Sequence, residues 1–458
     1  MQRRIDERLS KQIDHAGGRV QVVYRAHSEL KLDPKNPRRH SPRQIRQIAS
    51  SMETFGFVVP VLVDARHKIV AGHGRVLAAR LLGWTEVPTI CLDHLSEAQA
   101  KAFAIADNRL SENSIWDSRQ LGQQLKELSE LKIDFSLEVT GFDMGEIDLR
   151  IQDLDLDGEQ GADSGDVLDD APTGPPVSRP GDLFLLGDRH KVGCGNALEQ
   201  DAYTKLMGAE LAAAAFSDPP YNLPIDGNVS GLGAIRHKDF VMASGEMNQT
   251  QFVAFLVQAL SLLARHSVDG ALHFICMDWR HMFELLTAGK QVYTALKNLC
   301  VWTKNHTGLG TFYRSRHELI FVFKHGHASH RNNIQLGKYG RDRTNVWNYP
   351  SPRTPSEEGN LLALHPTVKP VRLVADAILD CTARGDVVLD GFLGSGTTVI
   401  AAERTGRRCY GLEVDPRYID TIIRRWQAYT GGHARNAATG RYFNELEAER
   451  AEDMRDGK

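Results

Sequence analysis

A carboxylate, two prolines and an aromatic ring stand together at Asp218, Pro219, Pro220 and Tyr221, directly after the small apolar run 212–217. Prolines cannot donate to a strand ladder, so the chain must leave its sheet there in a stiff turn. The Asp218 carboxylate and the Pro219 carbonyl can both accept hydrogens from an amine, and the Tyr221 ring can stack on a planar base. The pattern therefore predicts a site that holds an exocyclic amine while its nitrogen attacks an electrophile. The alternative, a surface turn capped by Asp218, explains the prolines but gives Tyr221 no role.

A glycine-rich turn forms a second candidate site. Residues 386–399 read DVVLDGFLGSGTTV, in which a buried strand runs into Gly391, Gly394 and Gly396 before a helix begins. Glycines let the backbone turn sharply and approach a ligand, and a helix N-terminus presents unpaired N–H groups. The next strand ends at Glu413, about 20 residues on, where a carboxylate can accept two ribose hydroxyls. This order favours a nucleoside cofactor over a simple strand-to-helix turn, and a phosphate-binding loop is disfavoured because no lysine follows the glycines.

The composition sets limits on the class of protein. The chain has 458 residues, which predicts two or three domains, and its 41% hydrophobic and 25% charged residues are typical of a globular protein. A formal net charge of −3 means that any surface for nucleic acid must be local. Six cysteines without a CxxC pair argue against a zinc ribbon or a disulfide framework and favour a reducing cytoplasm. The polar start of the chain and its short apolar runs predict neither a signal peptide nor a membrane span.

The two candidate sites need a scaffold, and the chain beyond an acidic stretch supplies one. Residues 151–180 are rich in Asp, Gly and Pro, which predicts a flexible linker. After them, apolar strand-like runs alternate with helical segments, which predicts an α/β fold with helices on both faces of one sheet. We therefore expect a catalytic domain over 181–430, a charged tail over 431–458, and a separate N-terminal domain with a helical extension over 20–150.

Four short motifs stand in a fixed order across the predicted catalytic domain. They are SDPPYNL (217–223), HPTVKP (365–370), DGFLGSGTT (390–398) and GLEVDPRY (411–418). Together they resemble the amino-DNA methyltransferases in which the catalytic half precedes the cofactor half. The resemblance implies a Rossmann-like seven-stranded sheet in permuted order, S-adenosyl-L-methionine as cofactor, and direct methyl transfer to an amino nitrogen of a base in double-stranded DNA. Because that base is stacked inside the duplex, it would have to be flipped out.

The resemblance also implies roles for individual residues. The target-amine site would be formed by Asp218, Pro219, Pro220 and Tyr221. Glu413 would hold the cofactor's ribose, while Thr367 and Lys369 would reach its carboxylate, for which an ammonium is a sensible partner. The complete set expected around the cofactor is Asn196, Thr367, Lys369, Asp390, Phe392, Gly394, Gly396, Thr397 and Glu413. Asn196 stands where relatives usually carry Asp, and Gly391 where many carry Pro.

The acidic residue of the proline turn bears on the choice of acceptor. The turn resembles the adenine-N6 group, since the cytosine-N4 group more often carries Ser in place of Asp218. Adenine N6 is therefore the predicted acceptor, and cytosine N4 is the alternative. A protein-glutamine or RNA methyltransferase is disfavoured, because such enzymes more often carry Asn there. A non-enzymatic DNA clamp with a decayed methylase domain is a further alternative, against which the intact Asp218, Tyr221, Gly394, Gly396 and Glu413 argue.

A basic stretch lies between the two halves of the predicted catalytic domain. Residues 324–353 carry several Lys and Arg against a single acid, interleaved with Tyr and Trp, which suits phosphate contacts and base-edge reading. We expect DNA contacts from Arg331, Lys338, Arg341 and Arg343, with an ordinary solvated loop as the alternative. The preceding segment 302–323 is expected to form a loop over the pocket, and His317 and Glu318 within it are expected to be structural. The histidines of this region lack acidic or cysteine partners, so no metal site is predicted.

The N-terminal region carries a second resemblance. Residues 28–92 contain the segments LKLDPKNPRRH, FGFVVPVLVD and IVAGHGRVLAARLLGWTEVP, which are similar to the ParB N-terminal domain of chromosome-partition proteins and sulfiredoxin-like enzymes. The resemblance implies an α+β fold and a nucleotide-phosphate site at Gly72, Gly74 and Arg75, where glycines open a helix. His73 stands where sulfiredoxin chemistry needs a cysteine, so we expect an accessory role in binding DNA or a partner. The whole chain resembles phage- or prophage-type modification methylases, and a homodimer stays open.

Overall fold

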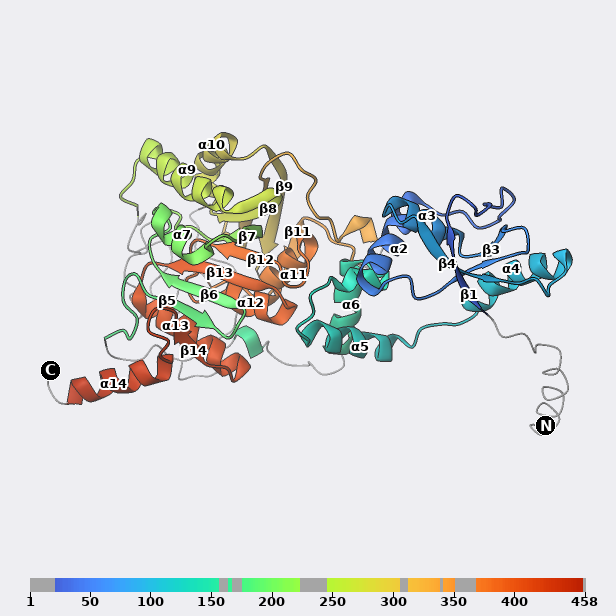
Figure 1. Cartoon of the computed structure of the whole chain (residues 1–458). Helices are drawn as coiled ribbons and strands as arrows, with labels where there is room; N and C mark the ends of the chain where they lie inside the picture. The colour runs from blue at the N-terminus through green and yellow to red at the C-terminus, as the bar shows by residue number, and fades with distance from the viewer. Residues whose placement is uncertain are drawn as a thin grey trace, which may run out of the picture. The chain divides into compact units, whose positions relative to one another are not determined.

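The structure, a computed structural model, describes residues 21–155, 164–166, 175–222, 245–304, 312–337, 341–350 and 368–455. The chain divides into two compact units, Met1–Asp143 and Met144–Lys458 (Figure 1). All six cysteines of the sequence lie in the described ranges as free thiols. Within those ranges, no helix is long and apolar enough to cross a membrane.

The first unit folds around a mixed sheet with its strands in the order β1-β4-β2-β3. These strands are β1 (Val22–Ala26), β2 (Val61–Val63), β3 (Ile69–Ala71) and β4 (Glu86–Cys91). The helices are α2 (Pro42–Phe55), α3 (His73–Leu81), α4 (Glu97–Glu112) and α5 (Ser118–Glu130), followed by the 3-10 turn η2 (Leu137–Thr140). Ser41 caps α2 by accepting a hydrogen bond from the Gln44 amide, and Val61, Val63 and Val76 are fully buried in the core. The unit is therefore an α+β fold, as the resemblance implied.

The second unit is built on one sheet, which the described residues form from ten strands in the order β11-β9-β10-β8-β7-β12-β13-β6-β5-β14. The strands are β5 (Leu183–Leu186), β6 (His190–Cys194), β7 (Ala212–Ser217), β8 (Ser267–Met277), β9 (Ala295–Thr303), β10 (His317–Lys324), β11 (Val346–Asn348), β12 (Val387–Asp390), β13 (Arg408–Glu413) and β14 (Ala434–Asn436). The helices are α6 (Met144–Asp155), α7 (Gln200–Met207), α9 (Gln249–Arg265), α10 (Met282–Val292), α11 (Val371–Cys381), α12 (Thr397–Thr405), α13 (Pro416–Thr430) and α14 (Phe443–Arg455), with 3-10 turns η3 (Ser164–Asp166), η4 (Trp279–His281) and η5 (Gln335–Gly337).

Strand directions in this sheet determine where the candidate sites meet. The seven neighbouring strands from β9 to β6 form the predicted sheet, and β11, β5 and β14 extend it at its edges. The strands β8, β7, β12, β13 and β6 are parallel to one another, whereas β10 is antiparallel between β8 and β9. The carboxyl ends of parallel strands lie at one edge of a sheet, so the turns after β7, β12 and β13 come together there. The predicted α/β fold is confirmed.

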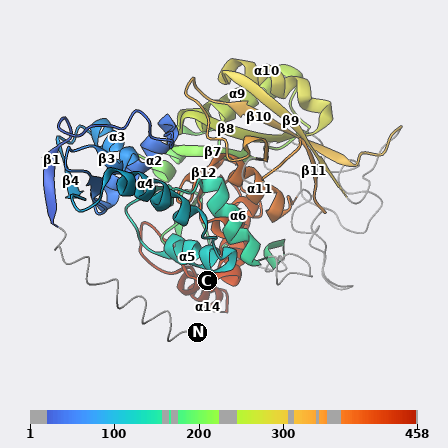
Figure 2. The same cartoon turned by 90° about the vertical axis from the view of Figure 1, so that its right-hand side faces the viewer.

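Helices cover both faces of the sheet (Figures 1 and 2). Val388 of β12 packs in the core cluster that contains buried residues of α11, α12 and α13. Its neighbours Val387 and Leu389 pack in the cluster that contains buried residues of α7, α9 and α10. Because successive side chains of a strand point to opposite faces, a strand covered on both faces is apolar throughout. This explains why β12 reads VVL without a polar residue before Asp390.

The described parts of the expected linker are attached to the second unit. Helix α6 belongs to that unit, where Asp148 lies 2.7 Å from Arg407 Nη2 and both side chains are almost fully buried. Asp166 accepts a hydrogen bond from the first amide of α11 at 2.8 Å. Ser178 donates from Oγ to Asp420 Oδ1 at 2.6 Å. The compact N-terminal unit therefore ends at Asp143, and α6 packs with the second unit.

The expected tail contributes to the sheet and the core. Strand β14 pairs antiparallel with β5 at the edge of the sheet. Phe443, at the start of α14, is fully buried, and its ring lies 5.9 Å from the ring of Phe184. The charged residues that follow Phe443 gave the segment its tail-like composition, whereas one aromatic side chain fixes it to the unit.

Candidate active site

Two turns meet at the carboxyl edge of the neighbouring parallel strands β7 and β12. Ser217, at the end of β7, donates a hydrogen bond from Oγ to Asp390 Oδ1 at 3.0 Å. Ser217 Oγ in turn accepts a hydrogen bond from the Gly391 amide at 3.3 Å. Both side chains are at most 3% exposed. This contact sets the proline turn that begins at Asp218 beside the glycine turn.

Asp218 lies in a cluster of buried charged groups. Tyr221 donates from its hydroxyl to Asp218 Oδ1 at 2.5 Å, and Lys369 Nζ lies 2.5 Å from Asp218 Oδ2. The same ammonium is 3.0 Å from Glu318 Oε2, and Lys304 Nζ is 2.5 Å from Glu318 Oε1. The side chains of Asp218, Glu318 and Lys369 are 17%, 10% and 4% exposed. Their charges are therefore balanced mainly by one another rather than by water.

Burial and ion pairing act in opposite directions on these groups. Burial raises the pKa of Asp218 above its ordinary value, and the Lys369 ammonium offsets part of that rise. Burial acts in the same direction on Glu318, but the Lys369 and Lys304 ammoniums outweigh it and lower the pKa of Glu318 to about 2. Burial disfavours the charge of Lys369, yet the two carboxylates raise its pKa well above the usual range. Glu318 and Lys369 are therefore firmly ionised, and the charge of Asp218 depends on its neighbours.

The glycine turn and Glu413 form the second half of the site. Gly394 and Gly396 have left-handed backbone, with φ of 52° and 82°, and a Cβ on Gly396 would lie 2.9 Å from the Ile422 side chain. The Gly394 amide donates to Glu413 Oε2 at 2.9 Å, and the Asp415 amide donates to Oε1 at 3.0 Å. Burial raises the pKa of Glu413 to about 7 despite these hydrogen bonds. A carboxylate thus lies at the end of β13, directly against the glycine turn.

Asp390 and Thr397 hold the glycine turn from within. Asp390 accepts hydrogen bonds from the Phe392 amide at 3.0 Å and from Thr398 Oγ1 at 2.7 Å. Burial raises the pKa of Asp390 to about 6. Thr397 donates from Oγ1 to the Lys369 carbonyl at 3.3 Å. Both side chains therefore use their polar atoms to connect the loops of the site to one another.

Phe392 and Asn196 lie at the same edge of the sheet. The Phe392 ring is 6.1 Å from the ring of Phe255 in α9. Asn196 follows β6, the strand beside β13, and its Oδ1 accepts a hydrogen bond from the Leu198 amide at 3.0 Å. The amide of Gly195 donates to the Glu413 carbonyl at 2.9 Å, which holds the Asn196 turn next to the end of β13. Both expected cofactor residues are thus close in the fold to Glu413.

Lys369, which we expect at the cofactor's carboxylate, has its ammonium between Asp218 and Glu318 in the structure without ligand. The physical reason is that two buried carboxylates need a counter-charge, which a 4% exposed ammonium supplies. Thr367, the other residue expected at the cofactor's carboxylate, lies outside the described residues.

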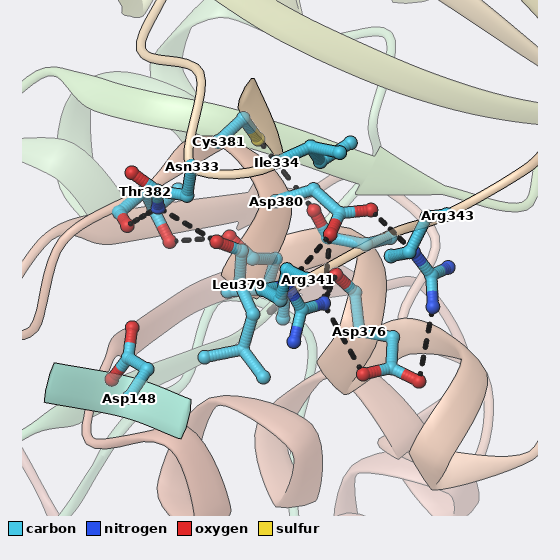
Figure 3. Close-up of polar contacts among 12 residues, drawn as sticks. Asp148, Asn333, Ile334, Arg341, Arg343, Asp376, Leu379, Asp380, Cys381 and Thr382 are labelled. Carbon is cyan, nitrogen blue, oxygen red and sulfur yellow. Dashed lines mark hydrogen bonds and ion pairs between the residues drawn. The ribbon is translucent and has the colours of Figure 1, made fainter. Parts of the chain in front are cut away.

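Two of the four expected DNA contacts are instead internal ion pairs (Figure 3). Arg341, 6% exposed, has Nη2 at 2.7 Å from Asp380 Oδ1. Arg343 has Nε at 2.8 Å from Asp380 Oδ2 and Nη1 at 3.2 Å from Asp376 Oδ2. Asp376 and Asp380 are one helical turn apart on α11, and two like charges so placed repel each other unless cations lie between them. Arg341 and Arg343 therefore have a structural role.

Other basic and aromatic residues of the region are accessible. Arg331 is exposed, and Lys338 lies outside the described residues. Between β9 and β10, Phe312 and Tyr313 are 86% and 83% exposed, with their ring centroids 4.4 Å apart. The Lys304 amide donates to the Arg316 carbonyl at 2.9 Å, which joins this segment to the charged cluster around Glu318.

The expectation for Glu318 missed its place in the site. We expected a structural residue at the start of a strand, whereas Glu318 contacts both Lys369 and Lys304 beside Asp218. The available signal was an acid within the run HELIFVFK, because a carboxylate in an otherwise apolar strand needs a buried partner. The sequence did not indicate which lysines would supply it.

The expected phosphate turn of the first unit has a tightly packed backbone. Gly72 has φ of 100° and precedes α3, and a Cβ there would lie 3.1 Å from the Arg75 guanidinium. A Cβ on Gly74 would lie 2.9 Å from the Ile48 side chain. Arg75 donates from Nη2 to the Pro60 carbonyl at 3.3 Å, and burial lowers the pKa of its guanidinium. In neither unit do the described residues include three His, Cys, Asp or Glu side chains placed to hold a metal ion.

Three family models match the chain. A DNA methylase model matches residues 212–424, which include both halves of the site described above. A ParB N-terminal domain model matches residues 11–109, and a ParB-methyltransferase HTH domain model matches residues 120–180. The HTH match covers the region in which we expected only a helical extension and a linker.

Known proteins resemble different parts of the chain. The ParB-like nuclease domain-containing protein YnaK of Escherichia coli (strain K12) is 42% identical over 81 residues, which are 18% of this chain and 93% of that protein. Type II methyltransferase M2.DpnII of Streptococcus pneumoniae is 26% identical over 238 residues, or 48% of this chain and 85% of that protein. Among solved structures, the cytosine-N4-specific PvuII DNA methyltransferase has 15% identity and a TM-score of 0.40, over 60% of this chain and 98% of that one.

Proposed function

The chain belongs to the N6/N4 family of DNA methylases and carries a ParB N-terminal domain, and from this premise we propose that it transfers a methyl group from S-adenosyl-L-methionine to adenine N6 in double-stranded DNA. The observation that carries the proposal is the hydrogen bond between Ser217 and Asp390. It sets the Asp218 carboxylate beside the glycine turn, so a target amine on one and a nucleoside cofactor on the other would meet at the edge of β7 and β12.

Adenine is proposed as the acceptor because of the acid at Asp218. The adenine-N6 group resembles this chain at the proline turn, whereas cytosine-N4 enzymes more often carry Ser there. A carboxylate also makes stronger hydrogen bonds to an amine that gains positive charge than a hydroxyl does. If the experiment below finds methylation at cytosine N4, the acceptor base changes and the methyl transfer itself stands.

The residues around the glycine turn fit the proposed cofactor. Without a Cβ at Gly394 and Gly396, the turn can approach a ligand closely, and α12 begins directly after it. Glu413 presents a buried carboxylate against the turn and would hold the ribose, while the turn and Phe392 would enclose the methionine part. Asn196 would lie beside the adenosine. When bound, the cofactor supplies a methyl group on a positively charged sulfur.

The residues of the proline turn would prepare the target amine. The Asp218 carboxylate and the Pro219 carbonyl would accept its two hydrogens, which orients the nitrogen lone pair. The amine nitrogen loses one proton as it becomes methylated, and Asp218 is the acceptor closest to it. The Tyr221 hydroxyl bonds Asp218 Oδ1 at 2.5 Å, which keeps the carboxylate in place, and the Tyr221 ring would stack on the flipped base.

We further propose that residues of two segments hold the duplex. Arg331 and Lys338 stay proposed phosphate contacts; Arg331 lies two residues before Asn333, which bonds Leu379 and Thr382 at the end of α11 that is farther from Asp218, so its contact would be outside the pocket. The segment before β10 adds Phe312 and Tyr313, whose exposed rings can stack on bases, together with Arg316. This segment is anchored at the same strand ends that carry Lys304 and Glu318, so DNA bound there would lie next to Asp218.

For the N-terminal unit we propose an accessory role in binding DNA, with a nucleotide phosphate at Gly72, Gly74 and Arg75. The HTH match at residues 120–180 supports the first part. Equilibrium dialysis of the full chain with nucleoside triphosphates tests the second. Retention of a nucleotide by the chain, and its loss in an Arg75→Ala variant, is the expected result.

The test of the main proposal is modified-base sequencing of DNA from cells that express the chain, beside cells that express Asp218→Ala. We expect methyladenine at one short motif, and none with the variant. Methylcytosine would overturn the choice of base. Unmodified DNA from cells with soluble, cofactor-binding protein would overturn the proposal itself.

A further inference from the structure

The Lys369 ammonium forms an ion pair with Asp218, the carboxylate that the proposed reaction needs. Its Nζ lies 2.5 Å from Asp218 Oδ2, while Tyr221 takes Oδ1 at 2.5 Å. A target amine would compete with Lys369 for Asp218. It would also gain positive charge during transfer, and a neighbouring ammonium repels that charge. Methyl transfer is therefore favoured when Lys369 lies farther from Asp218 than it does in this structure.

A withdrawn ammonium needs another buried partner. The Lys369 side chain is 4% exposed, so it cannot regain water by a small movement, and an unpaired buried ammonium is strongly unfavourable. Glu318 Oε2 is already 3.0 Å from Lys369 Nζ. The second oxygen of Glu318 is held by Lys304 at 2.5 Å, so the carboxylate is anchored while Lys369 changes its distance to Asp218.

We infer that Glu318 is a positioning residue, which holds the Lys369 ammonium when the target amine takes its place on Asp218. The inference rests on the proposed function and extends it, because neither turn of the site contains Glu318. Glu318 acts through Lys369 and touches neither base nor cofactor in this arrangement. The step moves no proton between Lys369 and Glu318: the contact of Lys369 with Asp218 is lost, while its contact with Glu318 is kept.

The alternative is that Glu318 only stabilises the fold by neutralising Lys304. The two roles differ in how the effects of substitutions combine. If Glu318 acts through Lys369, its loss can cost no further activity once Lys369 is gone. If Glu318 only supports the fold, the two losses multiply.

The experiment is a double-mutant cycle with Glu318→Gln, Lys369→Met and the pair together, assayed on a synthetic duplex that carries the motif found by sequencing. We expect Glu318→Gln to lower kcat by about tenfold or more, as loss of an electrostatic group in an active site does, with an unchanged KM for the cofactor. The pair should be no slower than Lys369→Met alone. Glu284→Gln is the matched control, because Glu284 is similarly buried but lies in α10, where its Oε1 is 3.5 Å from His281 Nδ1.

A pH series adds a readout that a structural role would not move. With one carboxylate fewer, Lys369 in Glu318→Gln should lose its proton at lower pH than in the wild type, which frees Asp218. The deficit in kcat should therefore shrink as the pH rises. If the Glu318→Gln chain does not fold, Glu318→Asp replaces it; its shorter side chain keeps the charge but moves it from Lys369, and an intermediate kcat is expected.

Multiplying losses, or a Glu318→Gln chain with wild-type kcat at every pH, would overturn the inference and leave the proposed function standing. A wild-type chain that binds the cofactor but transfers no methyl group to any DNA would overturn the proposed function and the inference with it.

Discussion

Ser217 and Asp390 are 173 residues apart in the chain, yet Ser217 Oγ donates to Asp390 Oδ1 at 3.0 Å. The contact joins the last residue of the strand before the proline turn to the last residue of the strand before the glycine turn. The two proposed binding sites are thereby held at one separation by the two buried hydrogen bonds of Ser217 Oγ and by the pairing of β7 with β12. The strands of the sheet, and not the binding loops, would thus determine the distance over which a methyl group moves.

Removing this hydrogen bond should affect turnover more than binding. Ser217→Ala leaves Asp390 Oδ1 with the Phe392 amide as its remaining donor and also removes the acceptor of the Gly391 amide. Each lost hydrogen bond costs about 1 kcal/mol in the free energy of unfolding. We expect kcat to fall several-fold, since small misplacements of reactants are costly. Ser267→Ala is the control, because Ser267 is also buried and donates to the Leu263 carbonyl at 2.8 Å away from the site. An equal loss of kcat in both variants would contradict the positional role.

Asp218→Ala should abolish methyl transfer and leave cofactor binding intact. Asp218 lies at the proline turn, whereas the expected cofactor residues surround the glycine turn, so calorimetric titration with S-adenosyl-L-methionine should give an unchanged Kd. Removing the carboxylate also leaves Lys369 beside Glu318, which keeps that ammonium paired. A variant that still methylates DNA at the wild-type rate would show that Asp218 is not the acceptor of the amine.

Cofactor affinity should increase with pH because of Glu413. Burial raises the pKa of this carboxyl to about 7, so in the ligand-free protein it is largely protonated at about pH 6 and ionised at about pH 8. The ionised form accepts both ribose hydroxyls, and Kd should therefore fall as the pH rises through this range. Affinity thus increases with pH, whereas the unfolding free energy of the chain without cofactor should decrease over the same range. The reason is that ionisation of Glu413 is less favourable in the folded chain than in the unfolded chain. A Glu413→Gln variant should bind weakly with little dependence on pH; a wild-type Kd that is flat with pH would refute the assignment.

Substitutions of Arg341 and Arg331 should affect different properties, stability for Arg341 and DNA binding for Arg331. Arg341→Ala leaves Asp376 and Asp380 with Arg343 as their remaining guanidinium, and removing one partner of a buried ion pair costs about 3–5 kcal/mol in unfolding free energy. Arg331→Ala removes an exposed charge, so we expect a smaller loss of stability than with Arg341→Ala, and weaker DNA binding with a smaller salt dependence. Denaturant unfolding and fluorescence anisotropy at several salt concentrations measure the two effects. Equal effects of both variants on DNA affinity, at equal stability, would restore Arg341 as a DNA contact.

The exposed rings before β10 should matter for duplex DNA in particular. If Phe312 and Tyr313 stabilise the gap left by a flipped base, Phe312→Ala with Tyr313→Ala should slow methylation of a duplex by about tenfold, comparable to the 1–3 kcal/mol of a stacked base. The same strand without its complement needs no flipping, so its methylation should change less. Phe283→Ala is the control, because Phe283 is 68% exposed on α10. Equal losses on duplex and single strand would rule out a wedge.

The sequence predicted the sheet and the two turns because each depends on local pattern. Apolar runs covered on both faces, such as β12, and prolines or glycines at strand ends leave a signal in a few adjacent residues. The ion pairs left no such signal. Arg341 and Asp380, or Lys369 and Glu318, are far apart in the chain, and nothing in either neighbourhood indicates which buried charge it will meet. Basic composition was therefore read as a DNA surface where the fold uses two of the arginines internally.

The pairing of Asp148 with Arg407 bears on how such a two-part protein can be rearranged. Arg407 is fully buried, and the carboxylate that neutralises it comes from α6, before the acidic stretch that composition marks as the joint. A catalytic unit that begins within that stretch would lack Asp148 and would bury the Arg407 guanidinium without its carboxylate partner. This would lower the free energy of unfolding by about 3–5 kcal/mol. We therefore expect a chain whose amino-terminal half is exchanged upstream of Met144 to be more stable than one exchanged within the acidic stretch. Helix α6 would then stay with the catalytic unit, whichever module precedes it.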